Sequence, residues 1–260
     1  MRHTSDVTIL NMTRYWDPMT ASIDWCEKNY EVSEYVVEFW NALSSLAFSA
    51  VGLLNLWVLR NLKGEVIERF IAVLFITVGL GSAAFHGTLK YENQMYDEVP
   101  MMWVAGAAIY CYLTLEDKIW IRRKELALFF VLYTFLWTLV HSFNSFVLVF
   151  QVNFGFMLTV NFLCMFYFQY KFGNKTTLMM LKVYFACQIV AFMCFLADIH
   201  FCEYFTVVNP QFHSWWHMFM SCCCHYSLMF EVMLRRAKHG KMKLTLEGCI
   251  LKCPTLKQAA

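Results

Sequence analysis

Charged residues are scarce in this chain of 260 residues. Asp, Glu, Lys and Arg make up 15% of the sequence, whereas hydrophobic residues make up 59% and aromatic residues 18%. A soluble domain of this length carries more charge and fewer aromatic residues. The sequence also lacks a basic stripe with interleaved aromatic residues, so no nucleic-acid partner is expected. Its first 29 residues are polar and contain no apolar region of the kind found in a cleavable signal peptide.

The apolar residues form long blocks, which is typical of a polytopic helical membrane protein. Each block offers roughly 15–25 residues, against about 20 needed to cross the hydrocarbon core. With no repeat of fixed period and no soluble second domain, the chain divides into a polar head (1–38), a helical bundle (39–234) and a basic tail (235–260). We therefore predict an all-α membrane protein, a bundle of seven transmembrane helices, at Phe39–Leu59, Phe70–Leu89, Val99–Leu115, Leu126–Val140, Phe146–Tyr170, Leu178–Ile199 and Phe212–Leu234.

Lysine and arginine are distributed unevenly between the two sides of this bundle. All but four of the 21 Lys and Arg residues follow the first, third, fifth and seventh spans, and the exceptions are Arg2, Arg14, Lys28 and Lys90. Basic residues favour the cytosolic side of a membrane. This distribution predicts a cytosolic C-terminus and a lumenal or extracellular N-terminus.

Three of the eight histidines fall at similar depths in this topology. His213 and His217 lie four residues apart on one face of the last span, a spacing that suits chelation of a metal ion. His86 lies near the outer end of the second span. Three imidazoles with an open fourth position form the ligand set of a catalytic zinc. The alternative is three separate bundle histidines, each with its own hydrogen bond, but their matched depth favours a shared Zn²⁺ site.

Two further polar residues accompany these histidines. Ser82 precedes His86 by four residues and shares its helix face, although a membrane serine often bonds its own helix instead. Asp97 is expected to open the third span, ahead of Pro100 in the first turn. It is either a helix N-terminal acid favoured by the dipole or a carboxylate that takes and returns a proton beside the metal. The sequence leaves both readings open.

The polar head is rich in acidic residues. The oxygen atoms of Asp24, Glu27 and Asn29, joined by Glu38 at the helix entrance, could hold Ca²⁺. The spacing differs from that of an EF-hand and lacks its glycine, so a solvated acidic surface is the alternative.

Other reactive side chains have simpler interpretations. His225 lies deeper and on another part of the last span, where packing or a buried hydrogen bond is expected. Cys26 and Cys202 both fall on the oxidising side, where a bond between them would tie the head to a loop. Asn11 begins a glycosylation sequon on the same side.

Six sequence blocks, in order, resemble the alkaline ceramidases, a family of seven-helix membrane enzymes. The resemblance covers about residues 20–235 and looks closest to the phytoceramidase-like branch. The blocks are Asp24-Trp-Cys-Glu-Lys-Asn-Tyr, Glu38-Phe-Trp-Asn, Gly81-Ser-Ala-Ala-Phe-His86-Gly-Thr-Leu, Gln94-Met-Tyr-Asp97-Glu, Asp198-Ile-His-Phe-Cys202-Glu and His213-Ser-Trp-Trp-His217.

The resemblance implies an amidohydrolase that cleaves ceramide to a sphingoid base and a fatty acid. It implies a zinc held by His86, His213 and His217, with Ser82 and Asp97 in the active site, and a Cys26–Cys202 disulfide. It also implies a calcium site that uses the side chains of Asp24, Glu27, Asn29 and Glu38 and the backbone carbonyl of Trp25.

Two other classes of protein remain as alternatives. A related seven-helix receptor with a structural zinc needs no proton shuttle such as Asp97. A zinc or lipid transporter needs polar residues along a path through the membrane, whereas those identified here cluster at one depth. We expect a ceramide substrate within the bilayer and no obligate protein partner, and a location in the endoplasmic reticulum, Golgi or plasma membrane.

Overall fold

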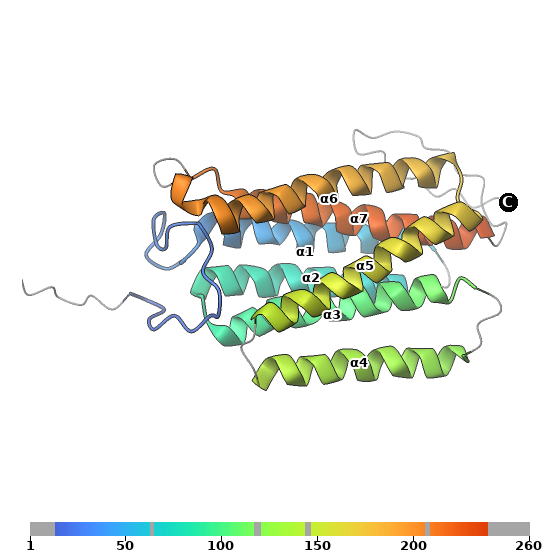
Figure 1. Ribbon diagram of the computed structural model, residues 1–260, viewed down its shortest axis with the longest axis horizontal. Helices are drawn as coiled ribbons and strands as arrows, with labels where there is room; N and C mark the ends of the chain where they lie inside the picture. The colour runs from blue at the N-terminus through green and yellow to red at the C-terminus, as the bar shows by residue number, and fades with distance from the viewer. Residues whose placement is uncertain (1–13, 63–64, 117–120, 144–146, 206–208, 239–260) are drawn as a thin grey trace, which may run out of the picture.

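The computed structural model describes residues 14–62, 65–116, 121–143, 147–205 and 209–238, and these parts of the chain form helices and loops without a β-strand (Figure 1). The head, residues 14–38, has no helix. A short 3₁₀ turn, η1 (Cys202–Phe205), follows α6. The seven α-helices are α1 (Phe39–Leu59), α2 (Val66–Thr88), α3 (Tyr91–Leu113), α4 (Arg123–Phe143), α5 (Val147–Phe172), α6 (Lys175–Phe201) and α7 (Phe212–Lys238).

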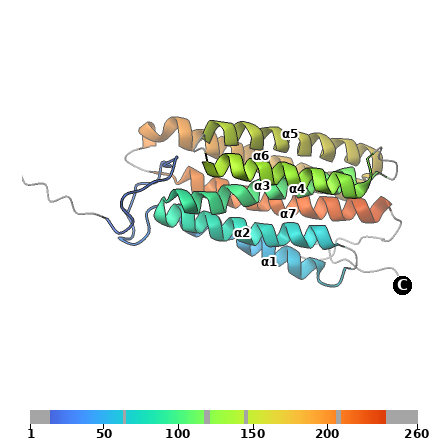
Figure 2. The ribbon, with the colours of Figure 1, turned by 90° about the horizontal axis from the view of Figure 1, so that it is seen from below.

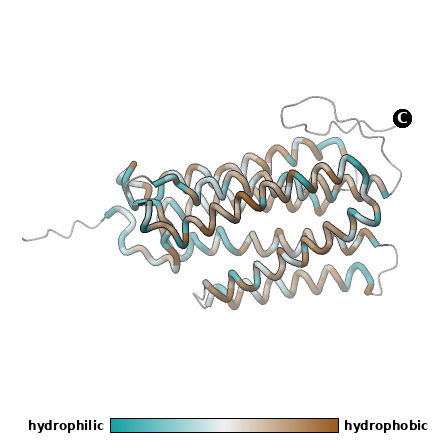
Figure 3. The backbone as a smooth tube through the Cα atoms, turned by 45° about the horizontal axis from the view of Figure 1, so that its top comes forward, coloured by the Kyte–Doolittle hydropathy of each residue, from teal (hydrophilic) through white to brown (hydrophobic). Residues whose placement is uncertain are grey.

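The helices run along one common axis, as two perpendicular views show (Figures 1 and 2). The head lies at one end of this bundle, and the C-terminal end of α7 lies at the other. Hydrophobic residues fill the middle of the bundle, whereas hydrophilic residues gather toward its two ends (Figure 3). This distribution is typical of a helical bundle whose apolar middle spans the hydrocarbon core of a bilayer.

Five helices are long and apolar enough to cross a membrane: α1, α2, α4, α5 and α6. The helices α3 and α7 are long enough but more polar. Their polar residues are buried inside the bundle, among them Gln94 and Glu98 of α3 and His213, His217 and Glu231 of α7. In membrane proteins, ionisable residues of this kind face the bundle interior. Accordingly, α7 packs against α1, α2, α3, α5 and α6.

The start of α3 differs from the prediction. The helix begins at Tyr91, so Asp97 lies in its second turn and Pro100 lies inside the helix. The expectation that Asp97 opens this span is therefore wrong, and so is the reading of Asp97 as a helix N-terminal acid. The polar residues before Asp97 are helical because the head packs on them: Gln94 Nε2 donates to Ser22 Oγ at 2.7 Å and Tyr91 N to Thr20 Oγ1 at 3.0 Å.

The helices α1 and α2 approach each other closely because small residues line their contact. A Cβ atom added at Gly79 of α2 would lie 2.5 Å from the backbone nitrogen of Ser49 in α1. Small residues allow helices to pack backbone to backbone in membranes. This contact fixes α2, which carries Ser82 and His86, against α1.

We expect Gly79→Ala to destabilise the protein by about 1–3 kcal/mol, because the added methyl group must push α1 and α2 apart. The measurement is the thermal unfolding temperature of the purified protein in detergent. Gly155→Ala is the matched control, since a Cβ atom at Gly155 in α5 meets nothing within 4 Å. Equal stability of the two variants would contradict this account of the α1–α2 contact.

Candidate functional site

The three histidines singled out from the sequence meet inside the bundle. His86 comes from the last turns of α2, and His213 and His217 come from the first two turns of α7. The centroid of the His86 ring lies 5.0 Å from the ring centroids of His213 and His217, and those two centroids are 4.5 Å apart. One nitrogen from each ring can be chosen so that all three lie within 4.8 Å of one another. Imidazoles at this separation suit a single metal ion.

The hydrogen bonds around these rings leave nitrogen atoms free. His86 Nδ1 bonds Glu38 Oε2 at 2.5 Å, and His217 Nδ1 bonds Ser44 Oγ at 2.9 Å. The Nε2 atom of His217 and the Nδ1 atom of His213 are buried without a hydrogen-bond partner among the described residues. Buried polar atoms are rarely left unpaired. Carboxylate and hydroxyl groups behind metal-binding imidazoles are also the usual outer partners of such ligands. The residues therefore fit a zinc ion.

The ring of His213 is held from both sides by aromatic residues. The indole of Trp25, in the head, stacks on it with a centroid distance of 3.6 Å and an interplanar angle of 21°. Trp216, three residues further along α7, is nearly parallel to it at 5.1 Å. This stacking fixes the plane of the imidazole and brings the head directly over the histidine group.

Ser82 and Asp97 lie beside the histidines and touch each other. The Ser82 hydroxyl lies close to the Asp97 carboxyl in the lining of one cavity, and it accepts a hydrogen bond from Ser45 Oγ of α1 at 2.9 Å. A close approach of α2 to α3 makes this contact, because a Cβ atom at Gly81 would lie 2.1 Å from the carbonyl oxygen of Tyr96. Pro100 has no N–H group to bond that carbonyl, so the α3 backbone is open at this point. The glycine and the proline thus shape the contact between Ser82 and Asp97.

Two adjoining cavities, which share part of their lining, lie beside this group. What we call the upper chamber is lined by Trp25, His86, Asp97, Phe195, His213 and Met220. What we call the deep chamber runs from Ser82 and Asp97 into the bundle, and Phe75, Val78, Ala105 and Leu228 are among its apolar lining residues. Asp97 and Met220 line both. The arrangement can hold a polar, reacting group beside the histidines and an apolar chain below it.

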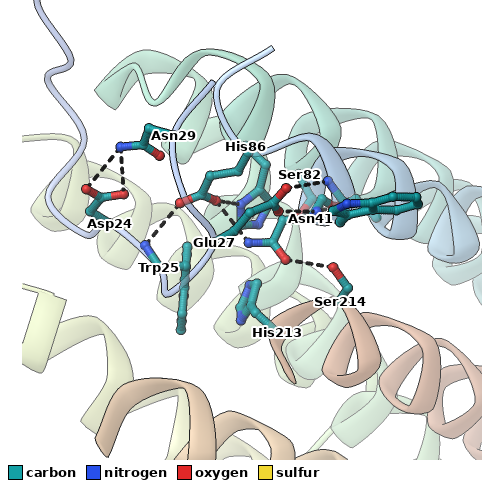
Figure 4. Close-up of polar contacts among 12 residues, drawn as sticks. Asp24, Trp25, Glu27, Asn29, Asn41, Ser82, His86, His213 and Ser214 are labelled. Atoms are coloured by element: carbon teal, nitrogen blue, oxygen red, sulfur yellow. Dashed lines mark hydrogen bonds and ion pairs between the residues drawn. The ribbon is translucent and has the colours of Figure 1, made fainter. Parts of the chain in front are cut away.

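Three of the four side chains predicted for a cation, those of Asp24, Glu27 and Asn29, lie in the head near the start of α1 (Figure 4), and the fourth, Glu38, is the residue before α1. Asn29 Nδ2 donates to both carboxylate oxygens of Asp24, at 3.3 and 3.2 Å, while the Asn29 Oδ1 atom is buried without a partner. Asp24 in turn lies close enough to Glu38 for their like charges to interact. Glu27 accepts hydrogen bonds from the backbone amides of Trp40 and Asn41, at 2.7 and 2.8 Å, and so caps α1.

The pKa values of these carboxyl groups are raised. Burial, and then the neighbouring Glu38 carboxylate, raise the pKa of Asp24 to about 6. Burial raises the pKa of Glu27 to about 7 and that of Glu38 to about 7. A bound cation would relieve the unfavourable burial of these like charges. The donor types, mostly carboxylates with one amide oxygen, are those that Ca²⁺ prefers.

The head is attached to the bundle on its other side by residues of α6. The structure contains the Cys26–Cys202 disulfide, with 5.4 Å between the two Cα atoms. Asp198, which is buried, accepts hydrogen bonds from the backbone amides of Cys26 at 3.1 Å and His213 at 3.2 Å. No role was predicted for Asp198, although it lies four residues before Cys202 in the block Asp198-Ile-His-Phe-Cys202-Glu. Its function is to position both the head and the start of α7.

A second group of buried charges lies toward the opposite end of the bundle. Glu68 of α2 pairs with Arg235 of α7 at 2.9 Å, and Arg235 also approaches Glu231 at 3.5 Å. The polar residues identified from the sequence do share one depth, but this second group, which the sequence did not predict, lies at another. Residues 60–70 and 231–238 look like ordinary membrane-interface charges, so only their contacts reveal a buried cluster.

His225 bonds Asn55 at 2.7 Å, as expected of a packing histidine. The glycosylation prediction at Asn11 lies outside the described residues.

The fold and the site define a helical membrane protein with a three-histidine group at the end of an apolar cavity. The sequence profile of the ceramidase family matches residues 17–254. The chain belongs to the ceramidase family, which confirms the predicted family and the prediction of an enzyme.

Several curated proteins are similar to the chain over most of its length. It is 29% identical to the alkaline ceramidase of Arabidopsis thaliana, covering 90% of this chain and 93% of that protein. A putative alkaline ceramidase of Dictyostelium discoideum is 29% identical, with 89% of this chain and 92% of that protein covered. Mouse alkaline ceramidase 3 is 28% identical, with 85% and 86% covered.

Proposed function

We propose that this enzyme hydrolyses the amide bond of ceramide to a sphingoid base and a free fatty acid, and that it requires zinc. The observation that carries the proposal is the group formed by His86, His213 and His217, which lies at the end of an apolar cavity. These three side chains would hold the metal. A zinc ion bound there would polarise the amide carbonyl and lower the pKa of a water molecule.

Asp97 and Ser82 would carry out the remaining chemistry. Asp97 faces both chambers, so its carboxylate can take a proton from the attacking water and later return it to the leaving amine nitrogen. Ser82 would donate a hydrogen bond to the oxyanion that forms from the amide carbonyl. The contact between Ser82 and Asp97 supports this division of roles, because it keeps both groups at the junction of the chambers.

The two hydrocarbon tails of ceramide would occupy the apolar parts of the cavity, so that hydrolysis takes place inside the membrane. We propose that all seven helices cross the bilayer, with the head on the lumenal or extracellular side. The burial of the polar residues of α3 and α7 supports seven crossings, since their polarity then faces other helices rather than lipid. The endoplasmic reticulum, Golgi and plasma membrane are all compatible with this topology.

We also propose that Asp24, Glu27, Asn29, Glu38 and the Trp25 carbonyl hold a structural calcium ion. The unpaired Asn29 Oδ1 atom and the raised pKa values of the carboxyl groups support it. Glu38 also bonds His86, so calcium would stabilise the histidine group through the head.

The zinc proposal is tested with two histidine variants. We expect His217→Ala to lose bound zinc and at least about a hundredfold of the rate of ceramide hydrolysis, because one of three ligands is gone. The measurements are elemental analysis of the purified protein and turnover of a fluorescent ceramide. His225→Ala, which removes a buried histidine of the same helix outside the group, should keep zinc. Full activity in His217→Ala would disprove the assignment.

The role of Asp97 is tested by Asp97→Asn. We expect hydrolysis to fall by about 10²–10⁴-fold while zinc content stays unchanged, because an amide cannot carry the proton. Ser82→Ala should cost about 10²–10³-fold. The same variants separate this enzyme from a receptor with a structural zinc, in which Asp97→Asn would leave function intact. An Asp97→Asn protein with wild-type turnover would remove the proton shuttle from the mechanism.

The calcium proposal predicts that Asp24→Asn lowers bound calcium and the thermal unfolding temperature without removing zinc. The physical reason is the loss of one anionic ligand from a site rich in carboxylates. Calcium and zinc are measured together by elemental analysis. Glu31→Gln changes an exposed acid of the same head and should alter neither quantity. Wild-type protein that binds no calcium at millimolar concentration would rule the site out.

A further inference from the structure

The deep chamber continues well beyond the proposed reaction centre. It begins at Ser82 and Asp97 and reaches Glu231 of α7. Glu231 lies fourteen residues beyond His217 on the same helix, which corresponds to about 21 Å along the helix axis. A hydrocarbon tail in this chamber would therefore lie inside the bundle for most of its length.

The lower half of the deep chamber is not purely apolar. Side chains with hydrogen-bonding groups enter its lining from three helices: Asn161 of α5, Tyr184 of α6, and Ser227 and Glu231 of α7. An unsubstituted alkyl chain offers such groups no partner, and buried polar groups without a partner are costly.

Asn161 has an unused hydrogen-bonding atom. The residue is 6% exposed. Its Nδ2 atom donates to the carbonyl oxygens of Ala105 at 3.4 Å and Met157 at 3.2 Å, whereas its Oδ1 atom is buried and has no hydrogen-bond partner in the part of the chain that the structure describes. The amide group is thus held in place on one side and has a free acceptor on the other. A ligand with a hydroxyl donor would satisfy it.

Glu231, at the bottom of the chamber, already has a positively charged partner within the protein. Arg235 lies beside it and also pairs with Glu68. One oxygen from each of these carboxylates and the Cys111 sulfur lie within 4.8 Å of one another, but the guanidinium group supplies the positive charge that a metal ion would bring. The charged floor therefore closes the chamber, and Asn161 above it is the acceptor left for a ligand.

We propose that the deep chamber binds a hydrocarbon tail that carries a hydroxyl group near its middle, and that Asn161 accepts the hydrogen bond from this hydroxyl. The mid-chain position of the hydroxyl follows from the depth of Asn161. Asn161 contacts Ala105, which lies eight residues beyond Asp97 on α3 and therefore about 12 Å deeper in the bundle. This inference rests on the proposed function, and it names a class of lipid within it: ceramides with a mid-chain hydroxyl on one tail.

The test compares full-length protein acting on four ceramides in detergent micelles. One has unsubstituted tails, one a mid-chain hydroxyl on the acyl tail, one a mid-chain hydroxyl on the sphingoid tail, and one a hydroxyl at acyl carbon 2, next to the reacting carbonyl. We expect kcat/KM to be roughly fivefold to tenfold higher for one of the two mid-chain hydroxyl substrates than for the unsubstituted one, as one hydrogen bond allows. The carbon-2 hydroxyl, which cannot reach Asn161, should not show this gain.

Two variants show whether Asn161 causes the preference. Asn161→Leu and Asn161→Ala should abolish the difference in kcat/KM between the mid-chain hydroxyl ceramide and the unsubstituted ceramide. Thr159→Val, an exposed position on the same helix, should retain the gain. Asn161→Ala keeps the test valid where the larger leucine impairs folding. Equal kcat/KM for hydroxylated and unsubstituted tails in the wild type, or a preference that survives both variants, would overturn the proposal.

A second readout does not depend on turnover. A free fatty acid with a mid-chain hydroxyl should raise the unfolding temperature of the wild type more than the unsubstituted acid does, and Asn161→Ala should abolish this difference. If no ceramide is hydrolysed, the proposed function fails, and this measurement alone decides the inference. The absence of a difference in the wild type would refute it.

Discussion

The buried carboxylate of Glu38 is the interaction on which the rest of this structure depends. It lies at the entrance of α1 and is fully buried. Its two oxygens accept from the Trp25 amide at 3.0 Å and the Asn41 side chain at 3.2 Å, and one of them also bonds His86. A buried carboxylate is tolerated only when such donors surround it. The head, α1 and α2 are therefore joined at one point, and the proposed calcium and zinc ligand sets share a residue.

Asp198 has the matching role on the opposite side of the histidine group. Through Cys26 it holds the head and through His213 the start of α7, and the nearby disulfide to Cys202 adds a covalent connection. The indole of Trp25, between these attachments, lies on the His213 ring. The orientation of the imidazoles thus depends on a segment without regular secondary structure, which explains why a polar head of this length accompanies a compact helical bundle.

The sequence was sufficient to predict what depends on periodicity and depth. Long apolar blocks predicted the helices, and the matched depth of His86, His213 and His217 predicted that these three residues meet. The sequence was not sufficient for features that depend on contacts between segments far apart in the chain. The start of α3 depends on contacts with the head, and the roles of Glu38 and Asp198 depend on backbone amides far away in sequence. Similarly, the His141–Glu98 pair, which ties α4 to α3, joins two residues that carry no shared sequence signal.

The two polar ends of the bundle have different chemical characters, and this distinguishes a lipid enzyme from a transporter. Near the head, imidazole nitrogens of His213 and His217 have no partner among the described residues, and a cavity lined by His86 and His213 adjoins them. At the far end, Arg235 already pairs with Glu68 and approaches Glu231, beneath a mostly apolar chamber. An ion crossing the bundle would have to break these buried pairs, which is strongly unfavourable. A hydrocarbon tail can fill the apolar chamber without breaking any of them. Under the proposed function, these charges would therefore form the floor of a lipid site rather than a transport path.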